Sequence, residues 1–173
     1  MKSASKLDAM SEAQAGQALA RCCGASRWVA GMLERRPFGS DTHLRTCADE
    51  TWAQMGPDDY REAFSHHPRI GASLDALREK FATTADLSAG EQAGALAASE
   101  AELEVLRDGN LRYEHRFGHI FIVCATGKTA AQMLELLEAR LDNDPDTELR
   151  IAAAQQHQIT LLRLDNLGHQ DFR

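Results

Sequence analysis

The chain of 173 residues has the length of one ordinary domain, and its 43% apolar and 26% charged residues exclude a disordered chain, collagen and a long coiled coil. Nineteen Lys and Arg against 26 Asp and Glu give a net charge of −7, which argues against binding to nucleic acid or to an anionic membrane. No apolar run is long enough to cross a bilayer and no signal peptide opens the sequence, so we expect one soluble domain over residues 1–173.

Helical signals dominate the first part of the chain. Apolar residues recur there at helical spacing, and cap residues or breakers separate the segments. The helices predicted from this pattern cover residues 6–21, about 28–36, about 41–55 and 58–67, and Gly56 and Pro57 end the third of them. Asp41 and Thr42 are the expected cap residues of the third helix, and Pro68 ends the fourth because the residue before a proline disfavours helical geometry.

The second part of the chain continues this pattern with one exception. Helices are predicted over residues 88–108, 129–141 and 146–164. The exception is the β-branched run Ile120–Cys124, which could be a buried strand. A lone strand cannot satisfy its backbone hydrogen bonds, and no partner strand is apparent. We therefore interpret the run as an extended or partly helical core segment of an all-α bundle.

His67 is the first candidate for chemistry. It lies in the unusual stretch from Phe64 to Gly71, where Pro68 directs its imidazole away from the end of a helix. A titratable group with a pKa near neutral that is both fixed and reachable suits acid–base catalysis. A histidine before proline is also common as a plain cap or surface residue, and the local sequence leaves both roles open.

Two further polar elements have equally open roles. Ser88 and Glu91 have the spacing of a capping box, but together with Gln92 they could instead line a helix N-terminus that receives a carboxylate. The two roles are compatible. Arg163 emerges beside the apolar stripe of the last predicted helix, so it should either pair with an internal acid or bind an anionic ligand.

Other chemistries find little support in the sequence. The four cysteines, Cys22, Cys23, Cys47 and Cys124, show no C-x-x-C spacing, and we interpret them as small buried residues, with thiol or redox catalysis as the alternative. His115 and His119 are four residues apart but lack the H-E-x-x-H pattern, so we predict no metal site. Phosphate-binding loops, dinucleotide fingerprints, serine-hydrolase elbows and basic aromatic stripes are also missing from the sequence.

Taken together, these segments resemble the family of OHCU decarboxylases, which convert 2-oxo-4-hydroxy-4-carboxy-5-ureidoimidazoline (OHCU) to (S)-allantoin in the last step of urate degradation. The H-P-R-I-G stretch followed by S-x-x-E-Q is the most specific combination. The similar elements are Cys22-Cys23-Gly24 with Trp28, Arg36-Pro37-Phe38, Ala63-Phe64 with His67-Pro68-Arg69-Ile70-Gly71, Ser88 with Glu91-Gln92, Phe117-Gly118 with Phe121-Ile122-Val123-Cys124-Ala125, and Ile159-Thr160 with Arg163-Leu164.

The resemblance implies a compact all-α bundle of roughly seven to nine helices, in agreement with the periodicity. It also implies a homodimeric carboxy-lyase of purine metabolism that needs no metal or organic cofactor. His67 and Glu91 would be the catalytic residues. The substrate would be bound by Pro68, Ser88, Gln92, Phe121, Ile122, Val123, Cys124, Ala125 and Arg163.

The expected chemistry agrees with a cofactor-free enzyme. Loss of CO2 from OHCU releases an electron pair beside a C=N bond, so the heterocycle is its own electron sink. His67 would handle a proton at the substrate hydroxyl and adjacent carbon, and Glu91 would orient His67 or the ureido group. Arg163 and helix-end amides would bind polar groups of the ring.

Several alternatives remain open at this stage. The chain could be a non-catalytic helical module that binds a small ureide, a metal-dependent hydrolase of a related ring, or a related enzyme acting on another ureide. The C-terminal residues lack the S-K-L peroxisomal signal, so we expect a cytoplasmic protein.

Overall fold

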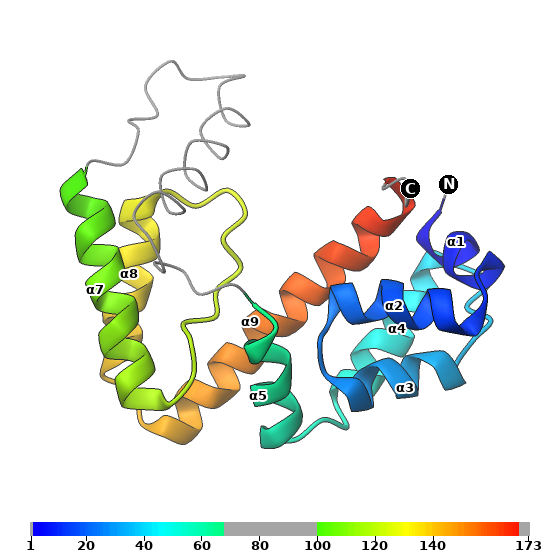
Figure 1. The fold of residues 1–173 in the computed structure, drawn as a ribbon, viewed down its shortest axis with the longest axis horizontal. Helices are drawn as coiled ribbons and strands as arrows, with labels where there is room; N and C mark the ends of the chain where they lie inside the picture. The colour runs from blue at the N-terminus through cyan, green and yellow to red at the C-terminus, as the bar shows by residue number, and fades with distance from the viewer. Residues whose placement is uncertain (1, 68–99, 170–173) are drawn as a thin grey trace, which may run out of the picture. The chain divides into compact units, whose positions relative to one another are not determined.

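The structure is a computed structural model that describes residues 2–67 and 100–169 (Figure 1). These residues form eight α-helices and one short 3₁₀ helix and contain no strand, so the all-α prediction is confirmed. None of the described helices combines the length and apolar character needed to span a bilayer. The chain divides into two compact units, residues 1–67 with 153–173 and residues 68–152. The single domain over residues 1–173 stays a prediction.

The first unit contains five helices from the N-terminal part of the chain and the second part of a long C-terminal helix. Its elements are α1 (Ser3–Ala9), α2 (Glu12–Cys22), α3 (Ser26–Glu34), α4 (Asp41–Trp52), α5 (Pro57–Ser65), the second part of α9 (Pro145–Asn166) and η1 (Leu167–His169). Helix α3 packs against α2, α4 and α5, and α1 packs against α2, α4 and η1. Trp28, Met32 and Phe64 are buried in the core of this unit.

The single helix predicted over residues 6–21 is wrong, because the chain forms two helices that break at Met10 and Ser11. Ser11 caps α2 in a capping box, in which its hydroxyl accepts from the Gln14 N–H (3.3 Å) and the Gln14 side chain accepts from the Ser11 N–H (3.1 Å). Arg36 Nη2 donates to the carbonyl oxygens of Leu7 and Met10, each at 2.6 Å, at the end of α1. The break therefore leaves the helix ends paired.

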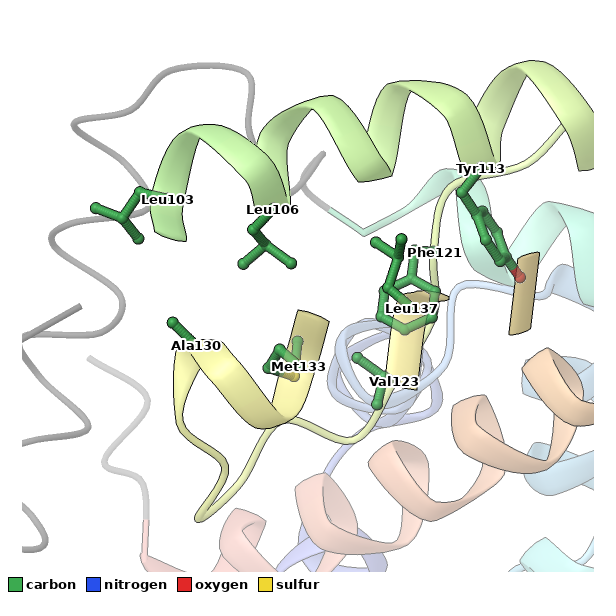
Figure 2. Close-up of a cluster of buried hydrophobic side chains, with 8 residues drawn as sticks. All are labelled: Leu103, Leu106, Tyr113, Phe121, Val123, Ala130, Met133 and Leu137. Atoms are coloured by element: carbon green, nitrogen blue, oxygen red, sulfur yellow. The ribbon is translucent and has the colours of Figure 1, made fainter. Parts of the chain in front are cut away.

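The second unit contains α7 (Glu100–Phe117), α8 (Ala130–Leu141) and the first part of α9. Helices α7 and α8 pack against each other, and Figure 2 shows their buried side chains together with those of the segment between them. The predicted end of a helix at residue 108 is wrong, because α7 continues to Phe117 and ends before Gly118, whose φ is 72°. Residues 88–99 of that predicted helix lie outside the described residues.

The run Ile120–Cys124 is neither helix nor strand, and Phe121, Ile122 and Val123 are buried, so the prediction of a core segment is confirmed. Its backbone has a side-chain partner in place of a second strand, because Arg140 Nη1 donates to the Ile122 carbonyl (2.8 Å). The Arg140 guanidinium also lies 4.6 Å from the centre of the Phe121 ring. Arg140 thus connects α8 to the segment 120–124 through both its charge and its hydrogen bond.

A buried carboxylate balances this arginine. Glu148, on α9, is fully buried and accepts hydrogen bonds from Arg140 Nε (2.8 Å) and Nη2 (2.5 Å) and from Asn143 Nδ2 (2.8 Å). The Tyr113 hydroxyl also donates to Glu148, and burial, with this hydrogen bond, raises the pKa of Tyr113. The charged groups of this core are therefore all paired, which is the condition for charge to be tolerated in an apolar interior.

Candidate functional site

His67 lies directly after α5 and is held at two points. Its backbone N–H donates to the Phe64 carbonyl (3.0 Å), which closes the last turn of the helix. Its ring reaches α9, where Nε2 lies 2.6 Å from Oε1 of Gln156. The side chain is half-buried. His67 therefore stands at a helix end in a fixed orientation, which is the geometry that its position before a proline predicts.

The partner of His67 belongs to a buried polar chain. Gln156 and Thr160 are both 0% exposed, and Gln156 Nε2 donates to Thr160 Oγ1 (3.2 Å). The Thr160 hydroxyl donates in turn to the Gln156 carbonyl (3.0 Å), and its side chain also forms a hydrogen bond with the Cys23 thiol. We call His67, Gln156, Thr160 and Cys23 the His67 cluster. All four residues lie in the first unit.

The thiols beside this cluster are poor nucleophiles. Burial raises the pKa of Cys22 to about 12 and that of Cys23 to about 11, so both remain protonated at neutral pH. Cys47 is also buried, whereas Cys124 is only partly buried. The interpretation as small buried residues therefore holds for three of the four cysteines, and thiol catalysis by the vicinal pair lacks a thiolate.

Gly24 allows the end of α5 to pack against the connection between α2 and α3. A Cβ atom at this position would lie 2.4 Å from Cγ and Cδ2 of His66 and 2.6 Å from its Cβ. Such distances require the backbone around His66 to move, because the Cβ atom of His66 cannot rotate away. The glycine of the Cys22-Cys23-Gly24 element thus fixes the chain one residue before His67.

Replacing Gly24 with alanine is therefore expected to lower both stability and turnover. We expect a loss of about 1–3 kcal/mol in the free energy of unfolding, the usual effect of overpacking, and a lower kcat because His67 is displaced. Urea unfolding and the assay described below measure the two effects. Gly16→Ala is the matched control, since a Cβ there meets only Leu33 Cδ1 at 3.5 Å. It should stabilise α2 by up to about 1 kcal/mol. Equal stability of the two variants would contradict the steric role of Gly24.

Arg163 has a partner that the sequence did not indicate. Its Nη1 donates to the carbonyl oxygens of Arg21 (3.2 Å) and Cys22 (3.3 Å), so it caps the C-terminal end of α2. It follows Gln156 and Thr160 along one face of α9, by seven and three residues. In the described part of the chain it pairs with no internal acid. A role in binding an anionic ligand stays a prediction.

The remaining predicted site residues divide into two groups. Residues 121–125 lie in the second unit, where Phe121, Ile122 and Val123 are buried. Lys128 donates from Nζ to the Cys124 carbonyl (2.8 Å) and from its backbone N–H to the Ala125 carbonyl (3.1 Å). The second group, Pro68, Ser88, Glu91 and Gln92, lies outside the described residues. No three metal-binding side chains gather within residues 2–67 and 100–169.

The sequence interpretation missed Gln156 and Thr160 as functional candidates. Their signal was present, since two polar residues occupy positions on the same face of α9 as the buried Leu149 and Ala152. Buried polar side chains need partners, so such positions mark a local network. The identity of the partner, 89 residues away in the chain, could not be found in this way.

Comparisons with known proteins agree with this fold. A sequence model described as OHCU decarboxylase matches residues 8–165. The uric acid degradation bifunctional protein TTL of Arabidopsis thaliana is 39% identical over 148 residues, which cover 84% of this chain and 45% of that protein. The 2-oxo-4-hydroxy-4-carboxy-5-ureidoimidazoline decarboxylase of Xenopus laevis is 29% identical over 80% of this chain and 78% of its own length. The chain thus spans less than half of the first relative and most of the second.

Solved structures give the same result at the level of the fold. A crystal structure of OHCU decarboxylase in the presence of (S)-allantoin superposes with a TM-score of 0.72 and 34% identity, covering 87% of this chain and 96% of that one. A crystal structure of (S)-allantoin synthase, at 17% identity and a TM-score of 0.68, covers 93% of this chain and 52% of that one and supports the fold alone. The protein is thus an all-α protein with the helical fold of these two structures. It belongs to the OHCU decarboxylase family.

Proposed function

We propose that this chain catalyses the decarboxylation of OHCU to (S)-allantoin in the degradation of urate. The observation that carries the proposal is the held imidazole of His67, fixed at a helix end by the buried Gln156 at 2.6 Å, in a chain whose family model spans residues 8–165. A positioned histidine is the group that a single proton transfer near neutral pH requires.

The proposed reaction needs three contributions from the protein. The C–C bond to the carboxylate breaks, CO2 leaves, and its electron pair delocalises into the ring across the neighbouring C=N bond. The ring nitrogen that receives the electron pair takes up one proton from water. His67 removes the proton of the substrate hydroxyl, whose carbon becomes the carbonyl, and delivers one proton to one face of the adjacent carbon, while Glu91 binds the ureido group. Arg163 and the backbone of residues 121–125 bind polar groups of the ring, which places the carboxylate out of the ring plane.

Three further features belong to this proposal and rest on the sequence alone. The enzyme acts as a homodimer, which the family resemblance supports, and it acts in the cytoplasm. It uses no metal or organic cofactor, because the substrate heterocycle accepts the electron pair itself.

The test is an assay with freshly generated OHCU, followed by its ultraviolet absorbance and by circular dichroism of the product. We expect the protein to accelerate the disappearance of OHCU and to produce (S)-allantoin in excess over the other enantiomer. An uncatalysed reaction delivers the proton to both faces of the ring, so the dichroism signal isolates the enzymatic step. Binding of OHCU with no acceleration would contradict the proposal and favour a non-catalytic ureide-binding module.

A further inference from the structure

The buried side chains next to His67 specify which of its two ring nitrogens takes part in proton transfer. Gln156 and Thr160 are fully buried and uncharged, and Gln156 contacts the ring while Thr160 contacts Gln156. We propose that Gln156 is a positioning residue that holds His67 in the Nε2–H tautomer, so that Nδ1 is the nitrogen that accepts and delivers the proton. This inference rests on the proposed function, in which His67 is the acid–base group.

The first step concerns the orientation of the Gln156 amide. The Thr160 hydroxyl has one proton, and it points to the Gln156 backbone carbonyl at 3.0 Å. Its oxygen therefore acts as an acceptor toward the side-chain amide, so the amide atom at 3.2 Å must be the donor Nε2. The carbonyl Oε1 of the same amide then faces His67.

The second step concerns the ring itself. An amide oxygen only accepts hydrogen bonds, so the His67 nitrogen 2.6 Å away must carry a proton. In a neutral imidazole one nitrogen is a donor and the other an acceptor, so the lone pair resides on Nδ1. A hydrogen bond to a buried partner also fixes the ring about its Cα–Cβ and Cβ–Cγ bonds. The same contact thus sets both the tautomer and the direction of Nδ1.

Within residues 2–67 and 100–169, the charged and titratable groups near the cluster come from α5 and the residue after it, from the end of α2, and from α9. They are Glu62 of α5, His66 directly after α5, Arg21, Cys22 and Cys23 at the end of α2, and Arg163 of α9. The two thiols stay protonated because burial raises their pKa values. Gln156 itself is an uncharged acceptor, so it selects a tautomer without supplying the negative charge that would favour a doubly protonated ring.

The direct test is the ¹⁵N spectrum of the imidazole side chains in the full chain, recorded with ¹⁵N-histidine labelling near pH 8. The signal that disappears in His67→Gln identifies His67. We expect it to show a protonated Nε2 and an unprotonated Nδ1 in the wild-type protein. In Gln156→Met, which removes the acceptor at similar volume, we expect a mixture of both tautomers. A wild-type His67 in the Nδ1–H form, or an unchanged pattern in Gln156→Met, would overturn the inference.

The pH profile of kcat/KM is a second measurement, and it would not shift if Gln156 only stabilised the fold. A carboxylate in Gln156→Glu stabilises the protonated ring, so the histidine-dependent limb of the pH profile of kcat/KM should move to higher pH by about one unit or more. Gln156→Met should lower kcat about 10-fold with KM within about twofold, because the ring is no longer aligned. Thr160→Val, which frees the amide to rotate, should have a smaller effect in the same direction.

Gln158→Glu is the matched control, because it places the same charge on an exposed position of α9. It should leave the pH profile in place, and an equal shift in both variants would contradict the direct contact. The two proposals fail separately. If the wild-type protein does not decarboxylate OHCU, the proposed function fails while the ¹⁵N spectrum still decides the tautomer. If it is active but His67 shows the other tautomer, only the role of Gln156 fails.

Discussion

His67→Ala is expected to lower kcat for OHCU decarboxylation by about 10²–10⁴-fold, the usual contribution of a positioned acid–base group. The protein should remain folded, because His67 is only half-buried. The substitution does leave the buried Gln156 amide oxygen without its partner, which costs about 1–3 kcal/mol. The assay therefore needs the melting temperature of each variant beside its rate.

The neighbouring His66 supplies the control for this experiment. It is exposed, lies one residue earlier in the same turn, and keeps its contact with Gly24 through its Cβ atom when replaced by alanine. We expect His66→Ala to retain turnover close to that of the wild type. Near-normal activity in His67→Ala, with the fold intact, would remove His67 from the mechanism.

The second large effect is expected for the buried ion pair of the second unit. Glu148→Ala leaves the Arg140 guanidinium, 9% exposed, without its counter-charge and the Tyr113 hydroxyl without its acceptor. Removing one partner of such a pair typically costs about 3–5 kcal/mol, which urea unfolding measures directly. Because Arg140 also donates to the Ile122 carbonyl, the segment 120–124 should lose order in the same variant.

Two further variants test whether the stability contributed by this ion pair depends on its burial or on pairing alone. Arg45 and Asp165 form an ion pair of the same length, 2.5 Å, but their side chains are 45% and 47% exposed. Asp165→Ala should therefore cost only about 0–1 kcal/mol. The double variant Arg140→Met/Glu148→Leu should recover much of the stability lost in Glu148→Ala, since no uncompensated charge remains. An equal loss in Glu148→Ala and Asp165→Ala would contradict this account of the core.

Local patterns predicted the helices well, because periodicity and caps act over short stretches of chain. The predicted helix over 129–141 agrees with α8 within a residue. Helix α4 begins after the cap residue Ser40, in place of the expected Asp41 and Thr42, and ends at Trp52, before the expected break at Gly56 and Pro57. The misplaced boundaries have physical causes. Ser11 forms a capping box that divides the first predicted helix into two. Helix α7 continues through Gly109, where a Cβ atom would lie 2.8 Å from the Leu137 side chain on α8. That close approach favours glycine within the helix, against its propensity.

The candidate site was predictable only in part, because its contacts join distant segments. The position of His67 before Pro68, at the end of a helix, indicated it as a candidate, and the structure gives it a fixed ring. Gln156 carries no motif, and only the packing of α9 beside the end of α5 brings it to the imidazole. Arg163 was expected to pair with an acid or to bind a ligand, but its guanidinium also donates hydrogen bonds to backbone carbonyls at the end of α2.

A crystal structure of this protein with (S)-allantoin bound would address the catalytic arrangement most directly. We predict that the product ring lies between His67 and Glu91, with a polar ring atom within about 3.2 Å of the His67 Nδ1 atom and the Glu91 carboxylate at the same ligand. Allantoin bound elsewhere, or His67 and Glu91 too far apart to touch one ligand, would contradict it.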